Sequence, residues 1–297
     1  IIKPVYCQRE LSISGQGDRR IMVNGRKELL TRLADKEGEF FVLISACTRE
    51  PYVECDEETF DDKVFLYFDG EEAKQAAQTL AGKKIPVTVT RLESKQMLFF
   101  FTNLYAMGVN AIEIPDEEKP ALVQLDEIIK KREKAEMPDG AVWVENPQLH
   151  LTAIYFAQEM RKPATPETKQ RLLELQEEIV ADFRKGSFLF ALDKEGQGTP
   201  MIKMKNEDKF QPVFTDAVEF GRFNREGRFR AVVVESDKLN KVLDKNAKGV
   251  ILNIMGVNLP LVVNRNTSEA EQEAPKLQMD PKLQMAQEID KLVKNTK

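Results

Sequence analysis

The single histidine, His150, sets the tightest limit on the chemistry open to this 297-residue chain. With one imidazole, neither a two-histidine metal site nor a His-Glu-x-x-His helix can form within one molecule. General acid–base catalysis near neutral pH would therefore depend on His150 or on carboxylates with shifted pKa values. We expect His150 itself to be an exposed or half-buried residue in the first turn of a helix.

Three cysteines, Cys7, Cys47 and Cys55, complete the set of metal-binding or nucleophilic side chains. No pair has the Cys-x₂₋₄-Cys spacing of a zinc site. Their odd number and low density are typical of reduced thiols and not of a disulfide framework. Cys47 ends an apolar stretch and is interpreted as a buried small hydrophobic residue. The sequence therefore predicts neither a metal centre nor a cofactor.

Short glycine-rich and acidic motifs are better explained as loops than as binding sites. Gly196-Gln197-Gly198 lacks the third glycine of a dinucleotide fingerprint and leads toward another strand. The acidic segment Asp56–Asp62 has neither the ligand spacing nor the glycine of an EF-hand loop. We therefore predict a strand connection at the first motif and a solvated loop at the second.

The balance of charge argues against two large classes of partner. The chain carries 44 basic and 49 acidic residues, a net charge of −5, which disfavours general attraction to nucleic acid or anionic lipid. Aromatic and arginine residues do alternate between Phe220 and Arg230, but Phe220 and Phe223 lie three apart on a predicted helix and should face the core while the arginines face water. Apolar runs are far shorter than the ~20 residues of a membrane span, and no signal-peptide pattern opens the chain. We expect a cytoplasmic protein that binds neither nucleic acid nor membranes.

The elements that must position these side chains occur in the same order twice. Met107-Gly108-Val109-Asn110 recurs unchanged 148 residues later as Met255–Asn258. We place a strand before each copy, at Leu98–Phe101 and at Val250–Ile254, and a further strand after it. Predicted helices lie at 71–80 and 120–135 in the first half, and at 148–161, 168–183 and 216–224 in the second. Such intermingled strands and helices predict an α+β fold, with two tandem copies of a mixed β-sheet module flanked by helices.

Three segments follow from this duplication. We predict a divergent first repeat over 1–137, a second repeat over 138–266, and a polar tether with a C-terminal helix over 267–297. Turn-forming residues at Met137–Gly140 mark the linker. The predicted last helix carries apolar residues at helical spacing. We expect this apolar face to pack either on its own domain or across a twofold axis. A homodimer through this helix is therefore one expected assembly.

The second half resembles the N-terminal domain of the SseB family, the enhanced-serine-sensitivity proteins of bacteria. The resemblance rests on the opening Asn146-Pro147-Gln148-Leu149, on Pro212-Val213-Phe214-Thr215-Asp216 followed by Glu219-Phe220, and on Gly249–Asn253. The family often has a proline where Ile254 stands. The resemblance implies α+β modules, sometimes in tandem, and a link to serine tolerance. It carries over no catalytic residue.

Residues at the ends of these strands are the candidate binding site. The Thr215 hydroxyl and the Asn253 amide could converge on a ligand or a partner backbone. The remaining candidates are Pro212, Phe214 and Asn103, the last placed at the strand end that matches Asn253. The alternative is structural: Pro212 starts a strand, Thr215 or Asp216 caps a helix, and Asn253 satisfies a turn.

We therefore expect a non-catalytic binding or regulatory protein, with an unknown protein partner or small ligand. The alternative is an enzyme with a carboxylate site, or one based on Cys47 and Cys55, in the cleft between the two copies. A deep inter-domain pocket with converging polar groups would favour the enzyme, whereas a flat apolar groove would favour partner binding.

Overall fold

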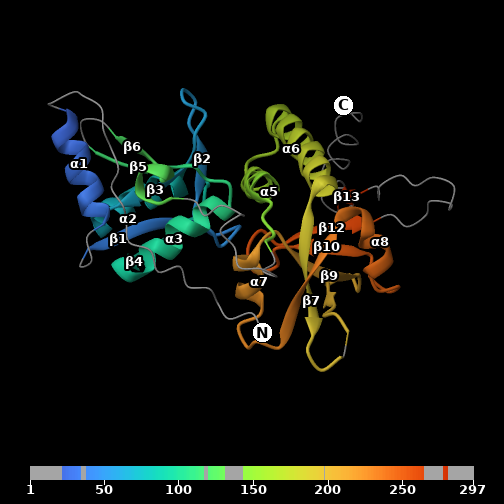
Figure 1. The fold of residues 1–297 in the computed structure, drawn as a ribbon. Helices are drawn as coiled ribbons and strands as arrows, with labels where there is room; N and C mark the ends of the chain where they lie inside the picture. Colours follow the sequence, from blue (N-terminus) through green and yellow to red (C-terminus); the bar gives the residue numbers. More distant parts are fainter. Residues whose placement is uncertain are drawn as a thin grey trace, which may run out of the picture.

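The chain folds into two β-sheet modules that lie side by side, with the helix α5 (Pro147–Glu159) between them (Figure 1). A computed structural model describes residues 22–34, 38–116, 120–130, 143–196, 198–263 and 277–279. The predicted linker at Met137–Gly140 and the predicted C-terminal helix, with the homodimer expected from it, lie outside the described residues. So do Cys7 and Gln197.

Within the described ranges, the first module contains six strands and four helices. They are α1 (Met22–Leu33), β1 (Glu39–Ser45), β2 (Val53–Cys55), β3 (Asp62–Tyr67), α2 (Gly70–Gly82), β4 (Val87–Glu93), α3 (Ser94–Ala106), β5 (Ala111–Ile114), β6 (Ala121–Gln124) and α4 (Leu125–Ile128). The strand order in the sheet is β4-β1-β3-β5-β6, and β2 pairs with β3 outside this path.

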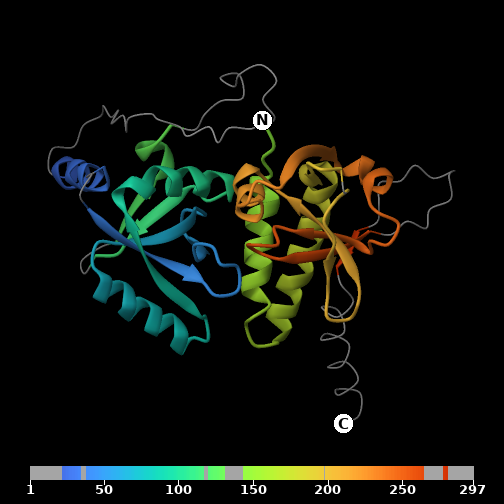
Figure 2. The same ribbon diagram turned by 90° about the horizontal axis from the view of Figure 1, so that it is seen from below.

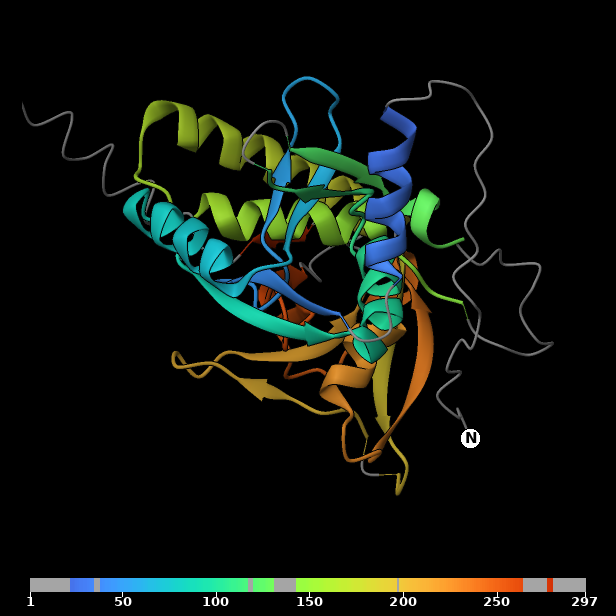
Figure 3. The ribbon, with the colours of Figure 1, turned by 90° about the vertical axis from the view of Figure 1, so that its left-hand side faces the viewer.

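The second module begins with two long helices, α5 and α6 (Pro166–Lys185), which pack along each other (Figure 3). The remaining elements are β7 (Ser187–Asp193), β8 (Ile202–Lys203), β9 (Lys209–Phe214), α7 (Ala217–Phe223), β10 (Phe229–Glu235), η2 (Ser236–Lys238), α8 (Leu239–Val242), β11 (Gly249–Leu252), β12 (Leu259–Val263) and β13 (Leu277–Met279). The sheet order is β10-β7-β9-β11-β12-β13, and β8 pairs with β9.

The two sheets share one topology. Each sheet has one parallel pair of strands, β3 with β5 in the first module and β9 with β11 in the second. The other pairs that the two sheets have in common are antiparallel. The second sheet adds β13, which pairs with β12. The predicted α+β fold with two tandem mixed-sheet modules is confirmed.

The repeated tetrapeptide, however, does not mark equivalent positions. Met107–Asn110 lies before β5, whereas Met255–Asn258 lies after β11. The predicted strand at Leu98–Phe101 is wrong, because this segment belongs to α3. A capping box between Glu93 and Gln96 starts that helix, and its apolar residues recur at helical spacing so that one face is buried. The apolar run alone did not separate strand from helix.

The helix predicted over 120–135 is also wrong for its first residues. Ala121–Gln124 forms β6, which pairs with β5, and the short helix α4 at Leu125–Ile128 is the helical part among the described residues of this range. Val123 alternates with half-buried neighbours, as expected for a strand with one face on the core. The strand β13 was likewise not predicted, because its residues lie in the segment over 267–297 that was interpreted as a polar tether and a C-terminal helix.

The helix α5 joins the two modules into one apolar core. Seven of its thirteen residues are buried, and they lie on more than one face of the helix. Buried residues of both sheets belong to one continuous apolar cluster that includes Phe40, Leu104, Ile154, Phe183 and Leu261. Seen from below, α5 lies between the strands of the first module and those of the second (Figure 2). Across the described ranges, we find no helix with both the length and the apolar character that crossing a membrane requires.

Candidate functional site

Two of the predicted site residues, Thr215 and Asn253, meet at the ends of neighbouring parallel strands. Thr215 follows β9 and Asn253 follows β11, so both lie at the same edge of the sheet. The Asn253 Nδ2 donates to Thr215 Oγ1 at 2.8 Å, and the Thr215 backbone N–H donates to Asn253 Oδ1 at 3.0 Å. Both residues are fully buried, and Asn253 has a φ of 45°. Their geometry is that of a turn whose polar groups satisfy each other.

Pro212 and Phe214 lie within β9 and are also buried. Pro212 does not start the strand as predicted. It lies where one edge of β9 changes from pairing with β8, at Phe210, to pairing with β7, at Val213. A proline is tolerated there because no ladder hydrogen bond requires its missing N–H. A ligand-binding role for these residues stays a prediction.

Asn103 lies apart from the other four candidates. It belongs to α3 of the first module, where its amide contacts Met107 Sδ at 3.3 Å. The predicted correspondence between Asn103 and Asn253 is therefore wrong, because one is a helical residue and the other follows a strand.

A buried ionic cluster lies beside Thr215, and the sequence did not predict it. We define it as Glu50, His150, Asp216, Glu219 and Arg222. Asp216 caps α7 by accepting from the backbone N–H groups of Val218 and Glu219 at 2.8 and 3.0 Å. Its second oxygen, Oδ2, accepts from the Thr215 hydroxyl at 2.7 Å and lies 3.4 Å from His150 Nδ1.

The other side of the His150 ring faces the first module. His150 Nε2 lies 3.1 and 3.2 Å from the two carboxylate oxygens of Glu50, which belongs to the loop between β1 and β2. Arg222 Nη1 then donates to Glu50 Oε1 at 2.8 Å and to Glu219 Oε1 at 2.6 Å. Five charged side chains from three separate parts of the chain thus meet where the modules join.

Burial and mutual attraction set the charges in this cluster. Burial alone would lower the pKa of His150, but the charges of Glu50 and Asp216 raise it well above its ordinary value. The same contacts overcome burial at the two carboxylates, so the pKa values of Glu50 and Asp216 are lowered. His150 is therefore an imidazolium between two carboxylates at neutral pH.

Glu219 differs from the other two carboxylates of the cluster. Burial, together with the charge of Glu50, raises its pKa to about 8, although Arg222 opposes this shift. Its Oε2 atom is buried and has no hydrogen-bond partner among the described residues. Glu219 is 1% exposed, and part of the Arg222 side chain, at 25%, connects the cluster to solvent. This burial leaves no room for a substrate beside His150, but the arrangement can hold a proton or a cation.

His150 was predicted to be exposed or half-buried, and this is wrong: it is 0% exposed. Its neighbours Leu149, Leu151 and Ala153 are apolar, and such an all-round apolar helix was the available sign of burial. Arg222 was expected to face water and instead bonds to two carboxylates. Glu50 could not be found from the sequence, because its partner His150 lies 100 residues away and no motif links them.

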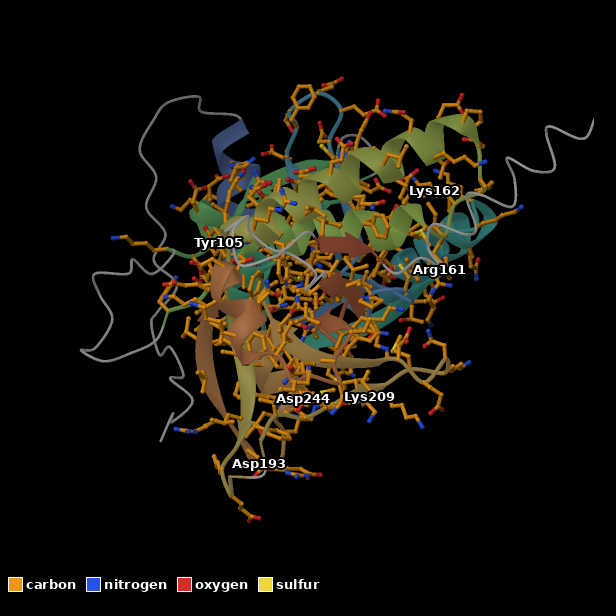
Figure 4. The ribbon with its side chains drawn as sticks, turned by 90° about the vertical axis from the view of Figure 1, so that its right-hand side faces the viewer. Tyr105, Arg161, Lys162, Asp193, Lys209 and Asp244 are labelled. Atoms are coloured by element: carbon orange, nitrogen blue, oxygen red, sulfur yellow. The ribbon has the colours of Figure 1, made fainter. Side chains whose placement is uncertain are left out.

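The structure also contains an open cavity between the two modules, here called the inter-module groove. It has a volume of about 360 Å³. Its walls are the end of β1, the strand β2, the turn before β4 and the C-terminal half of α5. Three acidic residues (Glu54, Glu57, Glu159) and three basic residues (Lys84, Arg161, Lys162) line it. Figure 4 shows Arg161 and Lys162 near each other where α5 ends. No member of the ionic cluster lines this groove.

Two cysteines and two tyrosines line the groove. Three of these four side chains have raised pKa values, and the fourth, Cys47, contacts a neighbouring hydroxyl. Cys47 is half-buried and not fully buried as predicted, and its Sγ lies 2.9 Å from Ser45 Oγ. Partial desolvation, with the charges of Asp62 and Asp56, raises the pKa of the Cys55 thiol. Burial, with a hydrogen bond to a carboxylate in each case, raises the pKa values of the Tyr52 and Tyr155 hydroxyls. A nucleophile needs the opposite shift.

Two loop predictions can also be compared with the structure. In the acidic segment, Asp56 Oδ1 accepts from the backbone N–H groups of Glu58 and Thr59 at 3.0 Å, and Lys63 pairs with Asp56 at 2.7 Å. The segment is thus ordered by its own hydrogen bonds. Gly196 and Gly198 lie between β7 and β8 with φ of 81° and 89°, as expected for a strand connection.

Comparisons with known proteins add little to this description. No protein-family model matches the sequence, and no curated protein matches it either. Three chains of solved structures match over part of the chain, and Tic22 proteins are among them. Tic22 from Plasmodium falciparum is 12% identical with a TM-score of 0.22, covering 75% of this chain and 90% of that one. Anabaena Tic22, whose description adds protein transport, is 11% identical with a TM-score of 0.21, covering 76% and 91%. Likenesses with TM-scores this low support no argument about this chain, and the resemblance to SseB proteins stays a prediction.

Proposed function

We propose that this chain is a non-catalytic binding protein whose ligand occupies the inter-module groove. The observation that carries the proposal is the separation of two properties. The charged groups of the ionic cluster are buried and pair with one another, whereas the accessible cavity contains Cys55, Tyr52 and Tyr155, whose raised pKa values disfavour their reactive forms. A site that binds without breaking bonds needs access and complementary contacts but no activated nucleophile.

The groove is formed by both modules, and α5 holds its two walls together. Gln158 Nε2 donates to the Val53 carbonyl at 2.9 Å, and the Val53 N–H donates to Gln158 Oε1 at 3.3 Å. The Tyr155 hydroxyl donates to Asp62. These bonds fix β2 and the start of β3 against α5. A preformed cavity reduces the ordering that a ligand would otherwise require.

The lining favours a small zwitterionic ligand, such as an amino acid or a dipeptide. Pockets for small ligands have volumes of about 300–1,000 Å³, and this groove lies near the lower end of that range. Acidic and basic residues are present in equal number, which suits a ligand that carries both signs of charge. The resemblance to SseB proteins makes serine the first compound to test. A protein partner is the other ligand class that the proposal includes.

The proposal also includes a cytoplasmic setting. Cys47 and Cys55 are free thiols, as expected for a protein kept under reducing conditions.

The alternative is an enzyme with Cys47, Cys55 or carboxylates in the same groove. One feature favours it, because both thiols do line an inter-module cavity. Against it, the thiol of Cys55 has a raised pKa, and the single imidazole of the chain is held in the ionic cluster, which does not line the groove.

Binding can be tested with two adjacent lysines. Lys84 lines the groove, whereas Lys83, also exposed, does not. We expect L-serine or another member of a panel of amino acids and dipeptides to bind in isothermal titration calorimetry and to shift amide resonances of groove residues. Lys84→Glu should weaken this binding by about tenfold or more, since one lost charge contact costs about 1.4 kcal/mol or more. Lys83→Glu should bind like the native protein.

Equal weakening by both substitutions would place the binding outside the groove and contradict the proposal. Failure of the whole panel to bind would reject the small-ligand form of the proposal. Chromatography over a day tests whether the protein consumes any compound that it binds. Such consumption would support the alternative, that the protein is an enzyme.

A further inference from the structure

The unpartnered oxygen of Glu219 calls for a ligand within the ionic cluster. Glu219 Oε2 is buried and finds no hydrogen-bond partner in the part of the chain that the structure describes, while its Oε1 accepts from Arg222 at 2.6 Å. Buried carboxylate oxygens are nearly always satisfied, so an exception of this kind indicates a bound water or ion, or a functional role. Because Glu219 is 1% exposed, bulk solvent cannot satisfy this atom.

Two further ligand atoms point to the same place. Glu50, His150 and Glu219 each offer one oxygen or nitrogen atom, and these three atoms all lie within 4.8 Å of one another. The His150 Nε2 lies 3.1 and 3.2 Å from the Glu50 oxygens. Ligand atoms at the corners of a tetrahedron around zinc are about 3.3 Å apart, because zinc binds nitrogen and oxygen at about 2.0–2.2 Å. A metal ion could therefore bind with small side-chain movements.

The glycine at position 256 keeps space free beside two of these ligands. A Cβ atom on Gly256 would lie 2.9 Å from Glu50 Oε1 and 3.0 Å from Glu219 Oε2. The φ of Gly256 is not in the left-handed region, unlike that of Gly108, so its backbone conformation does not require glycine. The absence of a side chain at Gly256 instead leaves room next to the carboxylates.

The surroundings of His150 also match those of a metal-bound imidazole. Histidine ligands usually donate their second ring N–H to a carboxylate, which fixes the orientation of the ring. Here His150 Nδ1 lies 3.4 Å from Asp216 Oδ2, and that carboxylate is held by the Thr215 hydroxyl and two backbone N–H groups. The Nε2 atom is thus directed toward Glu50 and Glu219.

The charges of the cluster are consistent with a divalent cation. With a neutral imidazole, three carboxylates (Glu50, Asp216 and Glu219) and one guanidinium (Arg222) leave two negative charges. Arg222 contacts the Oε1 atoms of both glutamates, which leaves Glu219 Oε2 available.

We propose that Glu50, His150 and Glu219 bind one divalent transition-metal ion, such as Zn²⁺, at the junction of the two modules. Glu50 comes from the first module and the other two ligands from the second, so the ion links them. This site is separate from the inter-module groove and does not depend on the function proposed for it.

The single histidine allows a direct test on the native protein. Protein without a histidine tag is treated with EDTA, dialysed and titrated with Zn²⁺ by calorimetry. We expect one Zn²⁺ per chain. X-ray absorption at the zinc edge should show nitrogen and oxygen neighbours with the outer-shell signature of one imidazole, which only His150 can supply. A zinc–sulfur distance of about 2.3 Å would instead identify a cysteine site and overturn the proposal.

Variants then assign the ligands. Glu219→Gln keeps the shape of the side chain and its contact with Arg222 but removes an anionic ligand, and we expect Zn²⁺ affinity to fall by at least tenfold. Asp216→Asn should lower affinity by about 10–100-fold through the orientation of His150. The matched control is Glu226→Gln, since Glu226 is exposed and lies just after the same helix. Circular dichroism confirms that each variant is folded.

Undiminished zinc binding by folded Glu219→Gln would overturn the proposal. So would a native protein that binds no stoichiometric Zn²⁺, a result that requires no variant. In either case the groove can still bind its ligand, so failure of the metal site is distinguishable from failure of the proposed function.

Discussion

The two modules carry the same residues at one structurally equivalent place and use them differently. Phe41 pairs with Tyr67 in the first sheet and Leu189 with Phe214 in the second, so Asp69 corresponds to Asp216 and Glu72 to Glu219. Each aspartate caps the following helix by accepting from two backbone N–H groups. Asp69 and Glu72 are exposed, whereas Asp216 and Glu219 are buried.

The difference arises from what packs against each helix terminus. In the second module, α5 places His150 beside Asp216, and the loop between β1 and β2 places Glu50 beside both. In the first module, the residue before the cap is Phe68, which stacks under Arg32 at 3.7 Å and against Phe40. A capping motif thus became part of a buried ionic cluster only where the other module covers it.

The aspartate pair gives the sharpest way to break this comparison. Asp69→Ala should lower the free energy of unfolding by about 0.5–2 kcal/mol, the usual loss for a helix cap. Asp216→Ala removes a cap and also leaves His150 beside one carboxylate in place of two, so we expect a loss of about 3–5 kcal/mol. Urea unfolding followed by circular dichroism measures both values.

Equal losses in the two variants would show that the pairing with His150 contributes nothing to stability. Asp216→Asn is the intermediate test, because asparagine keeps the cap but not the charge. Its loss should fall between those of the two alanine variants.

Much of the fold could be predicted from the sequence. Local patterns identified the duplication, the helices α5, α6 and α7, and the strand β11, because apolar spacing and capping residues act over a few residues. The repeated tetrapeptide, which supported the duplication, was not structurally equivalent in the two modules. The order of elements was the sound argument for the duplication, since the strands of the two sheets follow the same order along the chain and within the sheet.

The ionic cluster could not be predicted in the same way. Glu50 contacts Arg222 across 172 residues, and no local pattern specifies a contact between modules. Asp216 and Glu219 were visible as a cap and a helix residue, which is also what Asp69 and Glu72 are. Only the packing of α5 between the sheets distinguishes the two pairs, and packing is a property of the assembled core.

The glutamate pair sharpens the comparison through pH. In metal-free protein with EDTA, Glu219 has its pKa raised to about 8 from an ordinary 4.5. Between these values the folded state holds a proton that the unfolded state has lost. The free energy of unfolding therefore falls as pH rises, by up to about 1.4 kcal/mol per unit from this group alone. Glu219→Gln removes this contribution, so it should gain stability relative to the native protein between pH 5 and pH 8.

Glu72→Gln is the matched control, because Glu72 occupies the equivalent position in solvent. Its free energy of unfolding should run parallel to that of the native protein over the same pH range. A parallel curve for Glu219→Gln as well would mean that Glu219 is ionised in the folded protein, and would contradict the raised pKa.

A pair of glycines tests how tightly the ionic cluster is packed, and we expect the smallest effects here. Gly82 ends α2 with nothing within 4 Å of an added Cβ, whereas a Cβ on Gly256 would press against Glu50 and Glu219. Gly82→Ala should stabilise the protein by about 0.4–1 kcal/mol by restricting the unfolded chain. Gly256→Ala should destabilise it by about 1–3 kcal/mol, because buried carboxylates held by Arg222 and His150 cannot move aside freely. Thermal unfolding measures the two shifts. If both substitutions stabilised the protein, the cluster would be loosely packed around Gly256. The two modules would then differ at this place in burial but not in tightness of packing.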